Sequence, residues 1–250
     1  MIESEVVFSI ARHAAWAPGV TTHERWAEWA RAPWLLTTGA EPKVAAMPAM
    51  LRRRAGLLGR MALEVAYDCL GQETNVPTVF CSRHGDVARS VDLLRDLAQG
   101  EPLSPTAFGM AVHNASAGLF SIARTDRANH VALAAGSASV EHAVIEACSQ
   151  LADGAPMVLL VACDLALPAP FDGFEDCDGQ PFAFAWAMVP TQRQAQHETM
   201  RLAWSACADA HAPLSNLPGG LDVLRFQHTG QAALTRAAGG KRWTWSRDAR

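Results

Sequence analysis

The side chains with the clearest chemical potential in this sequence are six cysteines, nine histidines and a serine within a run of small residues. That serine, Ser137, lies in Gly136-Ser-Ala-Ser139. It could act as a nucleophile if a base and the backbone N–H groups of a helix start faced it. Ser137 or Ser139 could instead only cap that helix. The segment lacks the second glycine of a GxSxG nucleophile elbow, so we favour a cap or a vestigial site.

The histidines near this serine in the sequence are His113, His130 and His142. No two of them have the spacing of metal ligands, and a catalytic triad is defined by its geometry rather than by sequence spacing. His142 follows Ser137 by five residues, so on a helix it would not stack directly over the serine. We therefore expect structural histidines that form hydrogen bonds, and no metal site.

The cysteines are scattered and include no CxxC pair, so they give no metal-binding or redox motif. The N-terminus lacks the basic start and apolar run of a signal peptide. The longest apolar run, 156–163, is far shorter than the roughly 20 residues that span a bilayer. These features predict a cytoplasmic protein with free thiols in its core and no membrane span.

The composition limits the class of protein and its partners. The 250 residues are 50% hydrophobic and only 18% charged, which excludes a disordered chain and favours a large core or a buried interface. The formal net charge is −4, so there is no basic excess for nucleic acid. We expect a globular protein that does not bind nucleic acid.

The hydrophobic periodicity predicts the elements that would position these residues. Strands alternate with helices, which is typical of a layered α/β domain. The strongest helix signal runs from Leu51 to Cys69, where apolar residues recur every three or four positions. Thr21 and Glu24 have the spacing of a capping box for an earlier helix. We predict strands over 5–10, 76–81, 130–135, 156–163 and 182–189, and helices over 51–69, 91–97 and 140–151.

The C-terminal part of the sequence is less regular. A further helix is predicted over 191–212, followed by an irregular tail. Trp243 and Trp245 alternate with polar residues and would add an edge strand at most. We therefore divide the chain into a domain over 1–190 and a C-terminal extension over 191–250.

Four short motifs follow one another in the middle of the chain. They are Ser82-Arg-His-Gly85, Leu103-Ser-Pro-Thr106, Val112-His-Asn114 with Ala117-Gly118, and Ala134-Ala-Gly-Ser-Ala-Ser139. In order and spacing they resemble the N-terminal half of a β-ketoacyl synthase, a condensing enzyme of the thiolase fold. The resemblance covers roughly residues 5–190. It implies an α/β fold with thiolase-like helix–sheet–helix layers over 1–190.

The resemblance implies that the nucleophilic cysteine of such synthases corresponds here to Ser137, or to Gly136 if the loop is shifted by one residue. No cysteine lies within ten residues of either, and Val140 stands at the family's next glycine. The family's two catalytic histidines have no matching context, although His228-Thr-Gly230 echoes one motif. A synthase without its thiolate and both histidines can form neither the acyl-enzyme nor the carbanion. We expect no condensation by this chain alone.

The sequence resembles a family of β-ketoacyl-synthase-like N-terminal domain proteins from aryl-polyene and related pigment gene clusters. The resemblance implies a non-catalytic subunit, similar to a chain length factor, that pairs with a complete β-ketoacyl synthase in fatty-acid or polyketide-type biosynthesis. It implies no cofactor for this chain, because acyl chains would arrive on the phosphopantetheine of an acyl carrier protein. The strand His130–Ala135 would align with its mate, and Ser104–Asn114 would border the partner's acyl tunnel.

The resemblance assigns two groups of residues to these partners. The first group would line the tunnel and the interface, with ordinary packing as the alternative for each member. The second group would contact the acidic carrier protein, or form only the solvated face of a helix. The first group is Phe108, Met110, Val112, His113, Asn114, Val131 and Leu133, and the second is Arg52, Arg53 and Arg54.

Two other functions stay open at this point. A serine acyl hydrolase or acyltransferase would use Ser137 as its nucleophile. A non-enzymatic homodimer would dock a carrier protein without enclosing an acyl chain. The sequence does not distinguish homomeric from heteromeric pairing, and it does not identify the acyl substrate.

Overall fold

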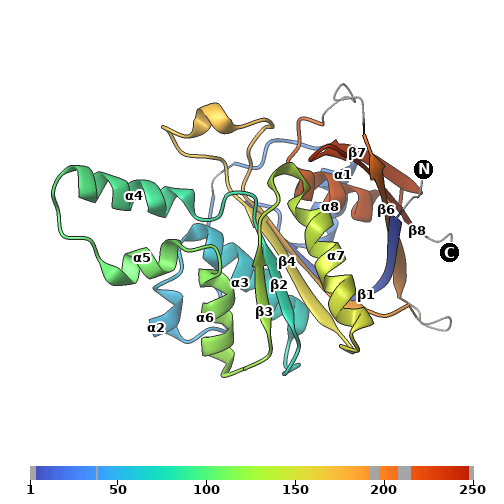
Figure 1. Cartoon of the computed structure of the whole chain (residues 1–250), viewed down its shortest axis with the longest axis horizontal. Coiled ribbons are helices and arrows are strands. Elements are labelled where there is room, and N and C mark those ends of the chain that lie inside the picture. The colour runs from blue at the N-terminus through green and yellow to red at the C-terminus, as the bar shows by residue number, and fades with distance from the viewer. Residues whose placement is uncertain (1–3, 38, 192–196, 208–214, 248–250) are drawn as a thin grey trace.

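An eight-stranded sheet runs through the molecule in the order β3-β2-β4-β5-β1-β6-β8-β7, and helices lie on both of its faces (Figure 1). The computed structural model describes residues 4–37, 39–191, 197–207 and 215–247. β2 is parallel to β3 and β4, and the other neighbouring strands are antiparallel. The strands are β1 (Ser4–Trp16), β2 (Thr78–Cys81), β3 (His130–Leu133), β4 (Val158–Asp164), β5 (Phe182–Val189), β6 (Glu198–Ala206), β7 (Ala233–Ala238) and β8 (Lys241–Arg247).

The helices enclose two hydrophobic cores, one on each face of the sheet. Helices α3 and α6 bury their apolar faces in one core, and α1, α7 and α8 bury theirs in the other. This helix–sheet–helix arrangement confirms the predicted thiolase-like layers. The helices are α1 (His23–Arg31), α2 (Ala49–Arg52), α3 (Leu57–Leu70), α4 (Val87–Ala98), α5 (Pro105–Ala111), α6 (Ala115–Arg124), α7 (Ser139–Ala152) and α8 (Gly219–Thr229).

Strand β5 shows how the sequence pattern produces these layers. Its large side chains all lie in the core of α1, α7 and α8, and its alanines all lie in the core of α3 and α6. Successive side chains of a strand point to opposite faces, so the predicted period-2 strand is confirmed. The alanine face allows α3 to pack close to the sheet. The large set is Phe182, Phe184, Trp186 and Met188, and the small set is Ala183, Ala185 and Ala187.

Two predicted helix boundaries are wrong. The helix predicted over 51–69 is divided, because α2 ends at Arg52 and α3 begins only after Gly56. The cap of α1 is Thr22 rather than Thr21, and its Oγ1 accepts a hydrogen bond from the Arg25 N–H at 3.4 Å. Both errors concern helix ends, where a shift of one residue does not change the apolar periodicity.

The prediction of a helix over 191–212 and an irregular tail is also wrong. Residues 198–206 form β6, which pairs with β1, so the sheet continues across residue 190 without a break. Residues 192–196 and 208–214 lie outside the described part of the chain. Trp243 and Trp245 do form a strand, but β8 lies between β6 and β7 and both rings are fully buried. Gly239-Gly240, both with positive φ, make the β7–β8 hairpin turn, which is a signal that the sequence offered.

The close packing of α8 on β5 can be tested at one glycine. A methyl group at Gly220 would lie 2.5 Å from the buried Phe182 ring, whereas one at Gly118 of α6 would meet nothing within 4 Å. We expect Gly220→Ala to lower the free energy of unfolding by about 1–3 kcal/mol, because the ring has no room to move. The control Gly118→Ala should raise it by about 0.5–1 kcal/mol. Denaturant unfolding checks both, and equal effects would contradict this packing.

Candidate functional site

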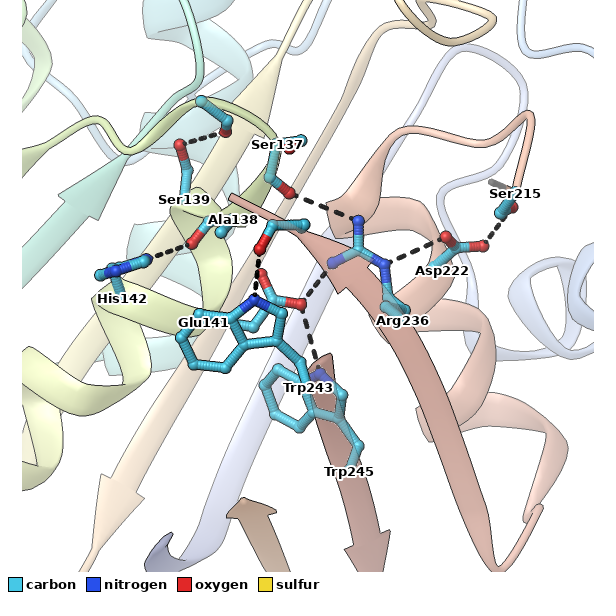
Figure 2. Close-up of polar contacts among 12 residues, drawn as sticks. Ser137, Ala138, Ser139, Glu141, His142, Ser215, Asp222, Arg236, Trp243 and Trp245 are labelled. Atoms are coloured by element: carbon cyan, nitrogen blue, oxygen red, sulfur yellow. Dashed lines mark hydrogen bonds and ion pairs between the residues drawn. The ribbon is translucent and has the colours of Figure 1, made fainter. Parts of the chain in front are cut away.

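The turn between β3 and α7 carries Gly136 and Ser137, and it is held mainly by its own backbone and Ser139 (Figure 2). Gly136 has a φ of +57°, in the left-handed region that favours glycine. The Ser139 hydroxyl accepts a hydrogen bond from the Ala135 N–H at 2.9 Å and donates one to the Gly136 carbonyl at 2.8 Å. Ser139 therefore bridges the turn, but the predicted cap is wrong, because the N-cap of α7 is Ala138 and no side chain caps that helix.

Ser137 has no base beside it among the described residues. Its backbone carbonyl accepts a hydrogen bond from Arg236 Nη2 at 3.3 Å, and no described contact involves its hydroxyl. The His142 ring hydrogen-bonds to the Ala138 carbonyl at 2.9 Å and lies edge-on to Trp243, with ring centroids 5.2 Å apart. The arrangement lacks the nucleophile–base hydrogen bond that activates a serine.

Arg236, from β7, joins the C-terminal strands to this turn through a buried ion-pair network (Figure 2). Its Nε donates to Asp222 Oδ2 at 3.2 Å, and its Nη1 forms an ion pair with Glu141, which is fully buried. Asp222 also accepts a hydrogen bond from Ser215 at 2.7 Å, and Glu141 accepts one from Trp245 Nε1 at 3.4 Å. Burial alone would lower the pKa of Arg236, but the two carboxylates raise it.

A small cavity of about 110 Å³ opens beside the Arg236 network. Ser137, Arg83 and Asp176 line it together with Arg236 and Asp222. Its walls are polar and contain two guanidinium groups that are already paired with carboxylates, since Arg83 also forms an ion pair with Asp176. No histidine is among the described residues that line this cavity.

The motif Ser82-Arg-His-Gly85 forms a second polar centre, at the carboxyl ends of β2 and β4. Asp164 Oδ1 accepts hydrogen bonds from Ser82 Oγ at 2.8 Å and from the Arg83 N–H at 2.7 Å. Burial raises the pKa of Asp164 to about 7, although these two hydrogen bonds oppose the shift. Gly85 has a φ of +71°, and a methyl group there would lie 2.8 Å from the His113 ring. The motif therefore has a structural role in shaping this loop.

The predicted tunnel and interface residues lie on α5, on the turn that follows it and on β3. Phe108 is 64% exposed and Val112 is 44% exposed, whereas Met110 is partly buried against the core of α3 and α6. His113 and Asn114 are exposed, and the His113 Nε2 lies 3.2 Å from the Leu133 carbonyl, which ties the turn to β3. Val131 and Leu133 are half-buried on β3. The structure therefore joins the turn after α5 to the edge strand.

The three predicted carrier-contact arginines differ in their surroundings. Arg52 Nη1 donates to the Lys43 and Val44 carbonyls, each at 3.3 Å, and so holds a loop. Arg53 and Arg54 are exposed. No described hydrogen bond or ion pair involves either guanidinium, so these two are available to an external carboxylate or phosphate.

Four of the six cysteines are poor candidates for a substitute nucleophile. Burial raises the pKa of Cys69 and Cys148 to about 12, and it also raises the pKa of Cys81 and Cys163. A thiol with a raised pKa is unreactive as a thiolate at neutral pH. Within the described ranges no group of three or more potential ligands could hold a metal ion, and no helix is long and apolar enough to cross a membrane.

Residues 26–246 match the family described as the N-terminal domain of β-ketoacyl synthase. The chain belongs to this family. The match extends past residue 190, in agreement with the sheet that continues through β6, β8 and β7. No curated protein matches the sequence.

Solved structures place the same fold in ketosynthase assemblies. A chain in the complex of the ketosynthase ApeO with its chain length factor ApeC from Xenorhabdus doucetiae is 26% identical. It has a TM-score of 0.84, with 97% of this chain and 100% of that chain covered. A chain of AntDE:AntF, a type II polyketide acyl-carrier protein in complex with its ketosynthase bound to the hexaketide, is 11% identical with a TM-score of 0.72. The match covers 98% of this chain and 99% of that chain. A chain of the ishigamide ketosynthase/chain length factor is 14% identical with a TM-score of 0.55, and the match covers 85% of this chain and 66% of that chain.

The burial of the Arg236 ion pairs predicts a large loss of stability when the arginine is removed. We expect Arg236→Met to lower the free energy of unfolding by about 3–5 kcal/mol, because Glu141 and Asp222 would be left buried without their cation. The control Arg95→Met removes a pair with Asp92 in which both side chains are more than half exposed. It should change the stability by less than about 1 kcal/mol. Chemical denaturation measures both, and similar losses in the two variants would contradict the network's importance.

The raised pKa of Asp164 predicts how the stability of the fold depends on pH. Its folded-state pKa is raised, so the folded state binds this proton more tightly than the unfolded state does, and stability should fall as pH rises from about 4 to about 7. Asp164→Asn keeps the oxygen that accepts from Ser82 and Arg83, and it should remove this decline. Unfolding midpoints at pH 4.5 and pH 8 test the prediction. An unchanged pH slope, compared with the exposed variant Asp92→Asn, would count against it.

Proposed function

We propose that this protein is the non-catalytic partner of a complete β-ketoacyl synthase, and that its shape limits the acyl tunnel during fatty-acid or polyketide-type synthesis, such as that of aryl polyenes. The observation that carries the proposal is an exposed apolar surface around the edge strand β3. This surface occurs in a ketosynthase-type fold that lacks a nucleophile–base pair at its turn.

The conformation of the turn supports the loss of catalysis. In a strand–turn–helix elbow the nucleophile occupies the strained position of the turn. Here the residue with positive φ is Gly136, which has no side chain that could react. We therefore assign the vestigial nucleophile position to Gly136 rather than to Ser137. Arg236 reaches this turn from β7 and donates a hydrogen bond to the Ser137 carbonyl.

The apolar surface around β3 has the character of an interface. One side of β3 pairs with β2, and no other strand of the described part pairs with its other side. Ten large apolar side chains are exposed in the described residues, and six of them lie on α4, on or beside α5, or in the loop that follows β4. Exposed patches of this kind mark interaction sites. The six are Leu94, Leu97, Leu103, Phe108, Val112 and Phe174.

The arrangement of α4 and α5 adds to this argument. The two helices pack on each other and project from the body of the molecule on the side of β3 (Figure 1). α5 buries none of its residues and α4 buries only Val91. Helices in water keep most of their stability from the packing of an apolar face, so an uncovered face of this kind favours a partner. In a heterodimer, Phe108 and Met110 would extend toward the synthase's tunnel.

The solved relatives support the identity of the partner. The Xenorhabdus chain is matched over its full length, so it is of about the same size as this one, and it comes from a complex of a ketosynthase with its chain length factor. The acyl chain would arrive on the phosphopantetheine of an acyl carrier protein, which requires no cofactor in this chain. The exposed Arg53 and Arg54, next to Met50, which is 74% exposed, form a surface suited to an acidic carrier protein.

Co-expression with a complete β-ketoacyl synthase from the same organism tests the proposal. We expect a complex in size-exclusion chromatography, and Leu97→Glu or Phe108→Glu should weaken it at least tenfold, because a charge would be buried in an apolar contact. The control Ile122→Glu changes an exposed apolar residue of α6 outside the six and should have no effect. Within the complex, Phe108→Ala or Met110→Ala should lengthen the products.

Two results would overturn the proposal. If the chain forms no complex with the synthase, the proposed pairing is wrong. If product lengths are unchanged in both alanine variants, the assignment of Phe108 and Met110 to the tunnel is wrong. The alternative function, a serine hydrolase or acyltransferase, is tested separately. It predicts that a fluorophosphonate probe labels the chain and that Ser137→Ala abolishes the labelling. We expect no labelling, since no base faces that hydroxyl.

A further inference from the structure

Four of the chain's nine histidines line one cavity of about 770 Å³, to which the β3–α7 turn contributes no residue. His13 comes from β1, His23 begins α1, His228 lies near the end of α8, and His197 precedes β6. Elements that are far apart in the sequence therefore bring their imidazoles to one place.

Three of these imidazoles pack against one another. The ring centroids of His23 and His228 are 5.3 Å apart, those of His13 and His228 are 5.8 Å apart, and those of His13 and His23 are 6.0 Å apart. His228 also stacks on the buried Trp26 of α1, with centroids 6.1 Å apart and an interplanar angle of 17°. The three rings are thus part of the contact that joins α1, α8 and β1.

Protonation of this cluster is unfavourable for two reasons. His13 and His23 are exposed, but His228 is partly buried, and its Nε2 atom has no hydrogen-bond partner among the described residues. An imidazolium donates from both ring nitrogens, so protonated His228 would leave a buried N–H unsatisfied. Positive charges on rings this close would also repel one another.

The charged groups around the cluster do little to offset this cost. Glu198 of β6 is already paired with Arg247 of β8 at 2.7 Å. Glu24 of α1 is exposed, so water screens its attraction for the imidazoles. Arg225 of α8 adds a positive charge and donates to an α1 carbonyl at 3.0 Å. The remaining titratable group that lines the cavity is His197.

α1 is held at this junction mainly through α8, on which it packs (Figure 1). α8 itself is fixed to the sheet by contacts that do not titrate. The Gln227 Oε1 accepts a hydrogen bond from Trp186 Nε1 of β5 at 2.9 Å, and Arg247 donates to the Gln227 carbonyl. α1 has only nine residues, and helices shorter than roughly 12–15 residues are marginal in water without a packing partner. α1 is therefore the element that a charged cluster would release.

We propose that the cluster of His13, His23 and His228 is an acid-sensitive latch, which holds α1 on α8 while it is neutral and releases α1 when it is protonated. The rest of the fold stays closed, and the released helix exposes Trp26 and Trp29, which are buried in the latched form. The inference is independent of the pairing with a ketosynthase, because the cluster lies on other elements than β3, α4 and α5.

The titration of His228 sets the pH range of the latch. Burial, followed by the charges of His13 and His23, lowers the pKa of His228 from 6.5 to about 4. The opened form therefore binds this proton more tightly, so the stability of the latch is present above about pH 6.5 and is lost as the pH falls toward 4. These two values raise the equilibrium constant for opening about tenfold between pH 7.5 and pH 5.5. Asp164 acts in the opposite sense, but it lies in the part of the fold that stays closed.

Hydrogen exchange of the backbone amides, measured on the full chain and corrected for the intrinsic effect of pH, tests the latch. We expect the opening constant of α1 to rise about tenfold between pH 7.5 and pH 5.5, whereas that of α3, in the opposite core, should not rise. An unchanged opening constant for α1, or an equal rise in α1 and α3, would overturn the proposal. These measurements need no variant, so they stand even where a substitution impairs folding.

His228→Phe tests the cluster by name, because phenylalanine keeps a flat ring against Trp26 but cannot take up a proton. It should reduce the rise for α1 to less than about twofold. The matched control His130→Phe changes an exposed histidine of β3 and should leave the rise intact. A second variant, His23→Gln, changes an exposed position of the cluster and should reduce the rise by about half. A full rise in either cluster variant would contradict the latch.

Discussion

The contact between Arg236 and the carboxylates of Glu141 and Asp222 is the constraint on which the candidate site depends. Three separate elements, β7, α7 and α8, supply these charges, and the guanidinium also bonds to the carbonyl of Ser137. A buried ion pair is costly to break because the remaining charge cannot be solvated. The network therefore holds the C-terminal strands against the turn.

Much of the fold could be predicted from the sequence, because long periodic segments specify their own faces. The alternation of β5 identified a strand with one large and one small face, and the order of the motifs identified the layers. The segment 191–212 was mispredicted as a helix, because β6 is defined by its pairing with the distant β1 and with β8. Pairing over a separation of about 190 residues leaves little local signal.

The site could be predicted only in part, for a similar reason. The sequence located the turn, but Gly136 and Ser137 could not be distinguished until the φ angle of Gly136 was known. The roles of Arg236 and Gln227 depend on partners 95 and 41 residues away in the sequence, so no local motif predicts them. The histidine cluster likewise combines residues from β1, α1 and α8. The Gly239-Gly240 pair, by contrast, is a local signal of the β7–β8 hairpin turn.

The two edges of the sheet differ, and this difference bears on how many chains can assemble through it. β3 lies on the side from which α4 and α5 project, and both helices carry exposed apolar side chains, whereas none of the exposed large apolar residues in the described part lies on β6, β7 or β8. If a partner covers the β3 edge, as proposed, the far edge offers no equivalent apolar surface to a third chain. The proposed pairing would therefore close at two members rather than extend into a filament.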